Sequence, residues 1–123
     1  MVGPIARDAL LGRDYWLVWS TPGPQTHPDA MAALIDDHLD WLLALESTGS
    51  VLMSGPLLEG PEIRPGAGVT VLRAAGADQA TDIAATDPFV VAGLRTFEVF
   101  RWRVNEGTVG VTISLGTGTY QWQ

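Results

Sequence analysis

The apolar and polar positions of this chain follow two periods in turn. Strand-like stretches, either alternating in polarity or rich in aromatic and β-branched residues, are predicted at residues 15–21, 50–54, 69–73, 94–104 and 108–115. A period of three to four residues predicts helices over 26–49 and 77–86. Residues 87–93 are predicted to form a turn or a single-turn helix that stops at Gly93.

The breaks between these stretches predict the connections. Residues 57–67 contain two prolines and are expected to be a loop, and Asn105-Glu106-Gly107 is typical of a hairpin turn. The expected order is β-α-β, a second β-α-β, and then a strand added by a C-terminal β-hairpin. This order predicts an α+β protein with a ferredoxin-like βαββαβ antiparallel sheet. Residues 1–13 are expected to be a lead-in and residues 14–123 a single domain.

The longest helical period runs from Thr26 to Gly49. Apolar residues three and four apart define one broad face, opposite most of the acidic side chains: Met31, Leu34, Ile35, Leu39, Leu42 and Leu45. His38 is four residues from both Leu34 and Leu42, so it belongs to the apolar stripe. The simpler interpretation of such a residue is a core imidazole with satisfied nitrogens. His27 is about 16 Å away along the axis, too far to share a metal ion, and is expected at the helix cap or surface.

Helices on one face of a small sheet leave the other face to be covered. The aromatic residues of the strands at 15–21 and 94–104 are candidates to fill that second face. Two such sheets packed face to face would bury these side chains. We therefore expect a homodimer.

Composition excludes several classes of function. The chain has no cysteine, and its seven basic residues are all arginine, so thiol nucleophiles, zinc–thiolate sites and lysine Schiff bases are excluded. The net charge of −7 argues against nucleic-acid binding. No apolar run approaches the ~20 residues that cross a bilayer, and no secretory signal is visible, so we expect no membrane partner and a cytoplasmic, bacterial protein.

Three motifs stand in order along the chain: DDHLDWL at 36–42, SGPL at 54–57 and ATDPFVVAGL at 85–94. Together they resemble the YCII-related family, over about residues 14–104. The resemblance implies a ferredoxin-like dimer of the dimeric α/β-barrel type. It also implies a site built from the histidine of the first helix and the aspartate of the Asp-Pro pair, which are His38 and Asp87 here. The Gly-Pro of the family falls on Gly55 and Pro56.

Physical chemistry allows this pairing. An aspartate held before a proline would bind the ring N–H of a histidine, fix its tautomer and stabilise its charged form, which makes a general base. The alternative is that Asp87 caps a turn and Gly55-Pro56 ends a strand. We expect the substrate to contact Ser54, Gly55, Pro56 and Phe89, with Trp16 and Trp41 as further walls of an apolar pocket.

Other chemistries find less support in the residues. A hydrolytic triad of Ser54, His38 and Asp87 has no nucleophile motif behind it, and two ligands are too few for a metal site. We expect neither a metal nor a cofactor. Arg73, Arg95, Arg101 and Arg103 are equal candidates to bind a substrate carboxylate.

Two functional hypotheses follow. The first is a small-molecule enzyme in which His38 and Asp87 act as a general acid/base pair. Such an enzyme, of the lyase or isomerase type, would abstract a proton and then isomerise or eliminate on a small cyclic or aromatic substrate. The alternative is a non-catalytic ligand-binding or accessory module of the same fold. The sequence names no substrate.

Overall fold

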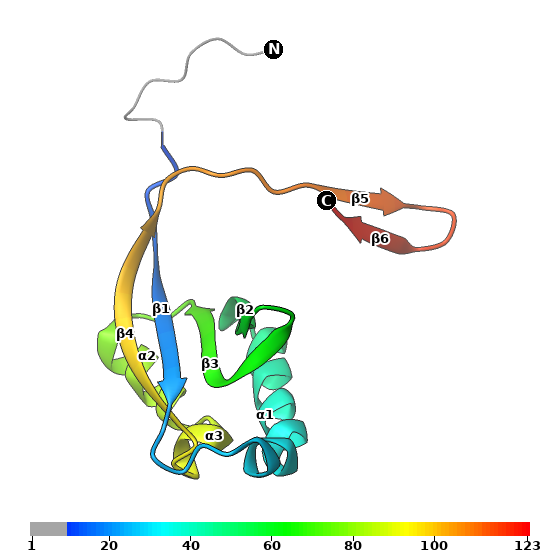
Figure 1. The fold of residues 1–123 in the computed structure, drawn as a ribbon. Coiled ribbons are helices and arrows are strands. Elements are labelled where there is room, and N and C mark those ends of the chain that lie inside the picture. Colours follow the sequence, from blue (N-terminus) through cyan, green and yellow to red (C-terminus); the bar gives the residue numbers. More distant parts are fainter. Residues whose placement is uncertain (1–9) are drawn as a thin grey trace. The chain divides into compact units, whose positions relative to one another are not determined.

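The computed structural model describes residues 10–123 (Figure 1). The chain divides into two compact units, one of which is the continuous segment Asp14–Arg103. The other unit contains Val104–Gln123 together with the residues before Asp14, of which 1–9 lie outside the described part. The lead-in predicted at 1–13 therefore falls largely outside that part, and a single domain over 14–123 stays a prediction.

The larger unit has the predicted α+β architecture. Its elements follow the order β1 (Arg13–Pro22), α1 (Pro28–Ser47), β2 (Val51–Glu59), β3 (Glu62–Leu72), α2 (Ala77–Ala85), α3 (Pro88–Val91) and β4 (Arg95–Val104). The four strands lie in the order β2-β3-β1-β4, which is that of a ferredoxin-like sheet. β1 and β2 both pair antiparallel with β3. The predicted fold class is confirmed.

The loop predicted over residues 57–67 is wrong, because β2 and β3 run through it and turn at Gly60-Pro61. Pro56 is tolerated because β2 is an edge strand, where a missing N–H donor costs no bond on the outer side. Pro65 falls where the register shifts between Pro56 and Leu58 and the regular pairing is interrupted. Both prolines thus sit in strands without breaking the sheet.

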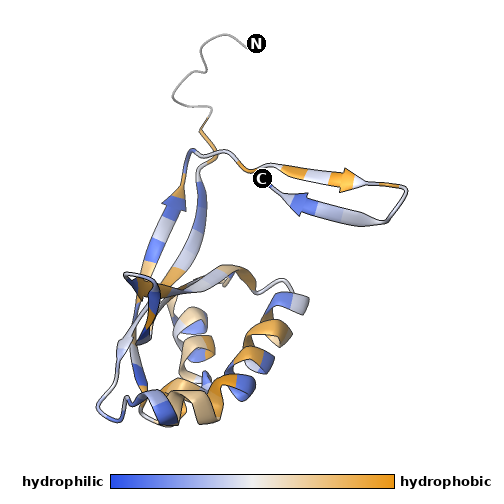
Figure 2. Ribbon diagram, turned by 45° about the vertical axis from the view of Figure 1, so that its right-hand side comes forward, coloured by the Kyte–Doolittle hydropathy of each residue, from blue (hydrophilic) through white to orange (hydrophobic). Residues whose placement is uncertain are grey.

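The three helices lie on one side of the four-stranded sheet (Figures 1 and 2). Between helices and sheet is a small core of Val18 from β1, Leu72 from β3, and Ala80 and Ala84 from α2. Trp16, Phe97 and Val99 pack against it, as the alternation of β1 and β4 predicts. On the opposite side of the sheet, Trp19, Phe100 and Trp102 are 43%, 48% and 40% exposed.

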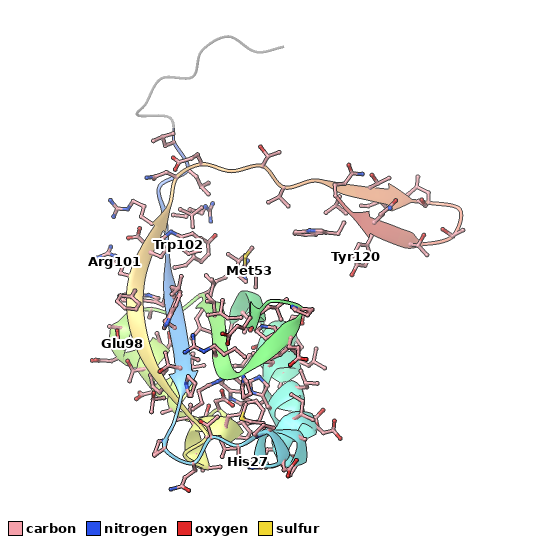
Figure 3. The ribbon with its side chains drawn as sticks, viewed as in Figure 1. His27, Met53, Glu98, Arg101, Trp102 and Tyr120 are labelled. Atoms are coloured by element: carbon pink, nitrogen blue, oxygen red, sulfur yellow. The ribbon has the colours of Figure 1, made fainter. Side chains whose placement is uncertain are left out.

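Helix α1 begins and ends as predicted. His27 is the N-cap, and its Nδ1 accepts a hydrogen bond of 3.1 Å from the backbone N–H of Asp29 (His27 is labelled in Figure 3). Gly49 follows the helix with φ of 79°, the left-handed conformation that ends many helices. No helix of residues 10–123 is long and apolar enough to cross a membrane.

The predicted apolar face of α1 is only partly core. His38 is the one buried residue of α1, whereas Ile35 and Leu39 are 40% and 45% exposed. The side chains of Ile35 and Leu39 line a cavity instead of filling the core. The apolar stripe of α1 therefore packs partly against the rest of the protein and partly forms a wall of this cavity.

The smaller unit contains a β-hairpin, but not the predicted one. β5 (Val111–Ser114) pairs antiparallel with β6 (Thr119–Trp122), and residues 105–110 form neither helix nor strand. The turn expected at Asn105-Glu106-Gly107 is therefore wrong, and the hairpin turns instead between Ser114 and Thr119. Gly118 has φ of 65°, which suits it to a tight turn.

Close backbone packing sets the start of β4. Gly23 N–H donates to Leu94 O and Gln25 N–H to Gly93 O, both at 3.0 Å. Gly66 has φ of 77°, and a Cβ there would lie 2.9 Å from Pro22 Cα and 3.2 Å from Leu94 O. Glycine at 66 thus allows the middle of β3 to approach the end of β1 and the segment that leads into Arg95.

Gly66→Ala is expected to lower the free energy of unfolding more than Gly60→Ala. Both glycines have positive φ, 77° and 61°, which costs a residue with a side chain about 1–2 kcal/mol. A Cβ at Gly60 meets no described atom within 4 Å, so Gly60→Ala reports the backbone cost alone. Urea denaturation measures both variants. Equal losses would show that the backbone around Gly66 accepts a methyl group freely.

Candidate functional site

The site is built around a buried carboxylate. Asp87 is 3% exposed and is the N-cap of α3, where its Oδ1 accepts a 3.0 Å hydrogen bond from Phe89 N–H. Pro88 follows it at the first helical position, where a missing N–H is tolerated. The sequence Asp-Pro-Phe thus folds into a stiff turn, and its capping bond fixes the direction of the Asp87 side chain.

His38 reaches this carboxylate from α1. Its Nδ1 lies 2.8 Å from Asp87 Oδ1, and His38 is 7% exposed. An ionised carboxylate only accepts hydrogen bonds, so Nδ1 carries the proton and donates. The structure therefore brings the two residues together, and Asp87 both caps its turn and binds the imidazole.

The second imidazole nitrogen has a different environment. Within residues 10–123, every fully buried side-chain nitrogen or oxygen has a hydrogen-bond partner. His38 Nε2 donates to or accepts from none of the described groups, so it is not fully buried. His38 also lines a cavity. In the neutral ring, Nε2 holds the lone pair that would take up a proton.

Arg95 is the third member of the site. Its Nη1 donates to Asp87 Oδ2 at 3.2 Å, and its Nε donates to Gly66 O at 3.2 Å. The side chain is 10% exposed, and this burial lowers the pKa of Arg95, an effect that the Asp87 carboxylate opposes. The buried positive charge of Arg95 and the negative charge of Asp87 therefore compensate each other.

Aromatic rings pack against both His38 and Arg95. The Phe89 ring, 2% exposed, stacks on His38 with centroids 4.3 Å apart and an interplanar angle of 19°. Arg95 Cζ lies 5.2 Å from the centroid of the same ring. Trp41 lies 5.8 Å from His38, centroid to centroid, and its Nε1 donates to Thr86 Oγ1 at 2.9 Å.

The cavity beside His38 has a volume of about 610 Å³. One wall comes from α1, the other from β2 and β3, and Phe89 and Arg95 close the inner end. Most of the lining side chains are apolar, including Met31, Ile35, Leu39, Leu42, Ile63 and Val69. This volume suits a small organic molecule with an apolar body.

Four of the residues expected to contact substrate line this cavity, namely Ser54, Gly55, Pro56 and Phe89. Trp16 and Trp41 do not line it, which corrects their expected place. Trp16 packs against the core between sheet and helices, because its position on β1 faces the helices in phase with Val18. Trp41 is three residues after His38 and packs against its ring on the side of Thr86.

The geometry supports neither a hydrolytic triad with Ser54 nor a metal site within residues 10–123. Ser54 Oγ is hydrogen-bonded to Thr70 Oγ1 at 2.9 Å, across β2 and β3, and no hydrogen bond joins Ser54 to His38 in the described part. In residues 10–123, no three histidine or acidic side chains gather closely enough to hold a metal ion.

Sequence reasoning missed or left open several groups of the site. Gly66, Gly68 and Thr70 line the cavity, but Gly66 fell in the expected loop, Gly68 just after it, and Thr70 in a predicted strand without an expected role. Arg95 was one of four arginine candidates without a signal to select it. The signal that existed was its position, immediately after the Asp-Pro-Phe turn and its closing glycine, which places it beside Asp87.

Comparison with known proteins identifies the family and the fold. A family model of the YCII-related domain matches residues 15–103. Among solved structures, the chain resembles 5-chloro-2-hydroxyhydroquinone dehydrochlorinase (TftG) from Burkholderia phenoliruptrix AC1100, in complex with 2,5-dihydroxybenzoquinone. The TM-score is 0.60 at 22% sequence identity, covering 72% of this chain and 92% of that one. No curated protein sequence matches.

The two histidines are expected to show opposite neutral tautomers. Asp87 accepts from Nδ1 of His38, whereas Nδ1 of His27 itself accepts from Asp29 N–H, which leaves the proton on Nε2. Two-bond ¹H–¹⁵N correlation spectra distinguish the two forms. In Asp87→Asn, His38 should become a mixture while His27 is unchanged. A His38 ring protonated on Nε2 in the unsubstituted chain would contradict the pairing.

Proposed function

The chain belongs to the YCII-related domain family, and from this premise we propose that it is a small-molecule enzyme in which His38 and Asp87 act as a general acid/base pair. One observation carries the proposal. Asp87 occupies Nδ1 of His38 at 2.8 Å, while Nε2 has no partner in the described residues and His38 lines a cavity of about 610 Å³. An imidazole beside a cavity, with one nitrogen held by a carboxylate and the other without a partner, is arranged to move a proton.

The reaction follows from what the residues offer. His38 Nε2 takes a proton from a carbon next to a carbonyl, and the C–H electron pair becomes the double bond of an enolate. Asp87 stabilises the imidazolium that forms. Return of the proton to another carbon completes an isomerisation. Departure of a leaving group with its electron pair completes an elimination instead. His38 then gives its proton to the departing group or to water, so that either course returns the neutral imidazole.

The substrate class follows from the walls of the cavity. An apolar lining with few polar groups favours a small cyclic or aromatic molecule. The TftG structure adds support, because that protein is a dehydrochlorinase with a small quinone bound. Elimination from a substituted ring is therefore the first reaction to test here.

The alternative is a ligand-binding or accessory module that uses the same cavity without turnover. The open cavity supports this alternative, because three side chains of the cavity lining, Ile35, Leu39 and Ile63, are 40%, 45% and 61% exposed. An enzyme that protects an enolate from water needs this cavity closed when substrate is bound. A module would function with it open.

We also propose that the chain is a homodimer, joined through the face of the sheet that the helices leave open. Trp19, Phe100 and Trp102 lie on this face and are 40–48% exposed. Apolar surface of this kind in a small protein commonly marks an interface. Cytoplasmic location remains a prediction from sequence.

His38→Asn is expected to reduce kcat/KM by about 10²–10⁴-fold, the range for loss of a general base. Asp87→Asn should also reduce it. Two assays suit the two courses: chloride release from 5-chloro-2-hydroxyhydroquinone, and deuterium uptake from D₂O into cyclic ketones followed by NMR. His27→Asn is the control and should leave both rates unchanged.

Equal turnover by His38→Asn and the unsubstituted chain would sink the enzyme proposal. A His38→Asn variant that only weakens ligand binding, in a protein without turnover, would favour the binding module.

Light scattering at micromolar concentration is expected to give twice the 13.1 kDa mass of one chain. Trp19→Glu should shift the protein towards the monomer, because it places a charge on the open face of the sheet. Leu43→Glu, at a position of α1 that is 59% exposed, is the matched control and should remain dimeric. A monomeric mass for the unsubstituted chain would exclude this assembly.

A further inference from the structure

Four arginines are equal candidates in the sequence to bind an anionic substrate, and their surroundings separate them. Arg103 Nε donates to Asp14 Oδ1 at 2.7 Å and Arg101 Nε donates to Asp14 Oδ2 at 2.8 Å, which holds the pKa of Asp14 well below its ordinary value. Arg73 Nη1 donates to the backbone carbonyls of Gly49 and Val51, at 3.1 and 3.3 Å. These three do not line the cavity, whereas Arg95 does.

Arg95 has donors left over. A guanidinium has five N–H groups, and in Arg95 one on Nε and one on Nη1 are used by Gly66 O and Asp87. Nη2 bonds to no described group, yet no fully buried side-chain nitrogen in residues 10–123 lacks a partner, so Nη2 is not fully buried. It lies on the side of Gly68, which lines the cavity as Arg95 does, because a Cβ on Gly68 would be 3.5 Å from Nη2, an ordinary contact distance.

The charges around the cavity favour an anion although the chain as a whole carries −7. Its described lining includes Arg64, Arg95 and His38, and no aspartate or glutamate. Asp87 lies behind His38 and Arg95 and is bound to both. Uptake of a proton by His38 would leave this end with a net positive charge, and so would favour negative charge in the cavity.

We propose that the cavity binds a small organic anion, an apolar body with one anionic oxygen group, and that Arg95 Nη2 is the group that recognises this oxygen. A carboxylate, or a phenolate or enolate, would satisfy the same donors, because each offers a charged oxygen to a planar pair of N–H groups. The inference deepens the proposed function. Negative charge that forms on the oxygen as His38 takes a proton would lie against Arg95.

Benzoate and benzamide test the inference, because they share a ring and a shape but differ in charge. Isothermal titration calorimetry of the full chain should show benzoate binding at least about tenfold more tightly, as expected for a hydrogen bond to a charged group. Arg95→Gln should abolish that preference and leave the affinity for benzamide within about threefold. Absence of the preference in the unsubstituted chain overturns the proposal, whatever the variants do.

Two matched variants locate the charge. Arg103→Gln removes one exposed positive charge outside the cavity, and Arg64→Gln removes one at an exposed position of its lining. Both should keep the preference for benzoate. Its loss in Arg103→Gln would assign the effect to net charge. If Arg64→Gln loses the preference for benzoate and Arg95→Gln keeps it, the anion is recognised by Arg64 and not by Arg95. Either result overturns the proposal.

A second pair of probes separates the two anion types. 4-Nitrophenol ionises near neutral pH and 4-nitroanisole does not ionise. Tighter binding of the phenol above its ionisation assigns a phenolate-type oxygen, whereas a preference for benzoate alone assigns a carboxylate. All readouts are binding constants. Anion binding without turnover therefore supports this inference and overturns the proposed function. Turnover without a preference for anions supports the proposed function and overturns this inference.

Discussion

One buried carboxylate organises the larger unit. Asp87 accepts hydrogen bonds from Phe89 N–H and His38 at Oδ1 and from Arg95 at Oδ2, so three elements, α1, α3 and β4, meet at two oxygen atoms. A charge buried to this degree is tolerated only with such partners, because desolvation alone would cost several kcal/mol. Removal of any partner leaves another polar group unpaired, so the arrangement constrains all three elements together.

The sequence predicts the centre of this arrangement by two routes. Helical phase places His38 on the apolar stripe between Leu34 and Leu42, but alone it favours a core imidazole. The pairing of His38 with Asp87 comes from the resemblance to the YCII-related family. Local rules add that an aspartate before Pro88 stands in a stiff turn, where it is also able to cap.

The errors concern contacts between distant segments. Pro56 suggests the end of a strand and Pro65 a loop, but the edge position of β2 and a register shift accommodate them within strands, and neither is visible without the sheet. Trp41 does not line the cavity, because its Nε1 donates a hydrogen bond to Thr86 Oγ1 on another side of His38. Arg95 is distinguished from Arg73, Arg101 and Arg103 only by what the fold places beside each one.

The two walls of the cavity and its inner end come from different segments of the chain. The apolar walls come from residues between Pro28 and Thr70, while Asp87, Phe89 and Arg95 come from a later stretch, and His38 is the main link between them. Ile35, Leu39 and Ile63 are well exposed and contribute little to the core. Substitutions at these three positions reshape the cavity without disturbing the hydrogen bonds of Asp87. The fold is thereby suited to divergence, because the shape of the cavity is able to change by single steps while the contact between His38 and Asp87 is kept.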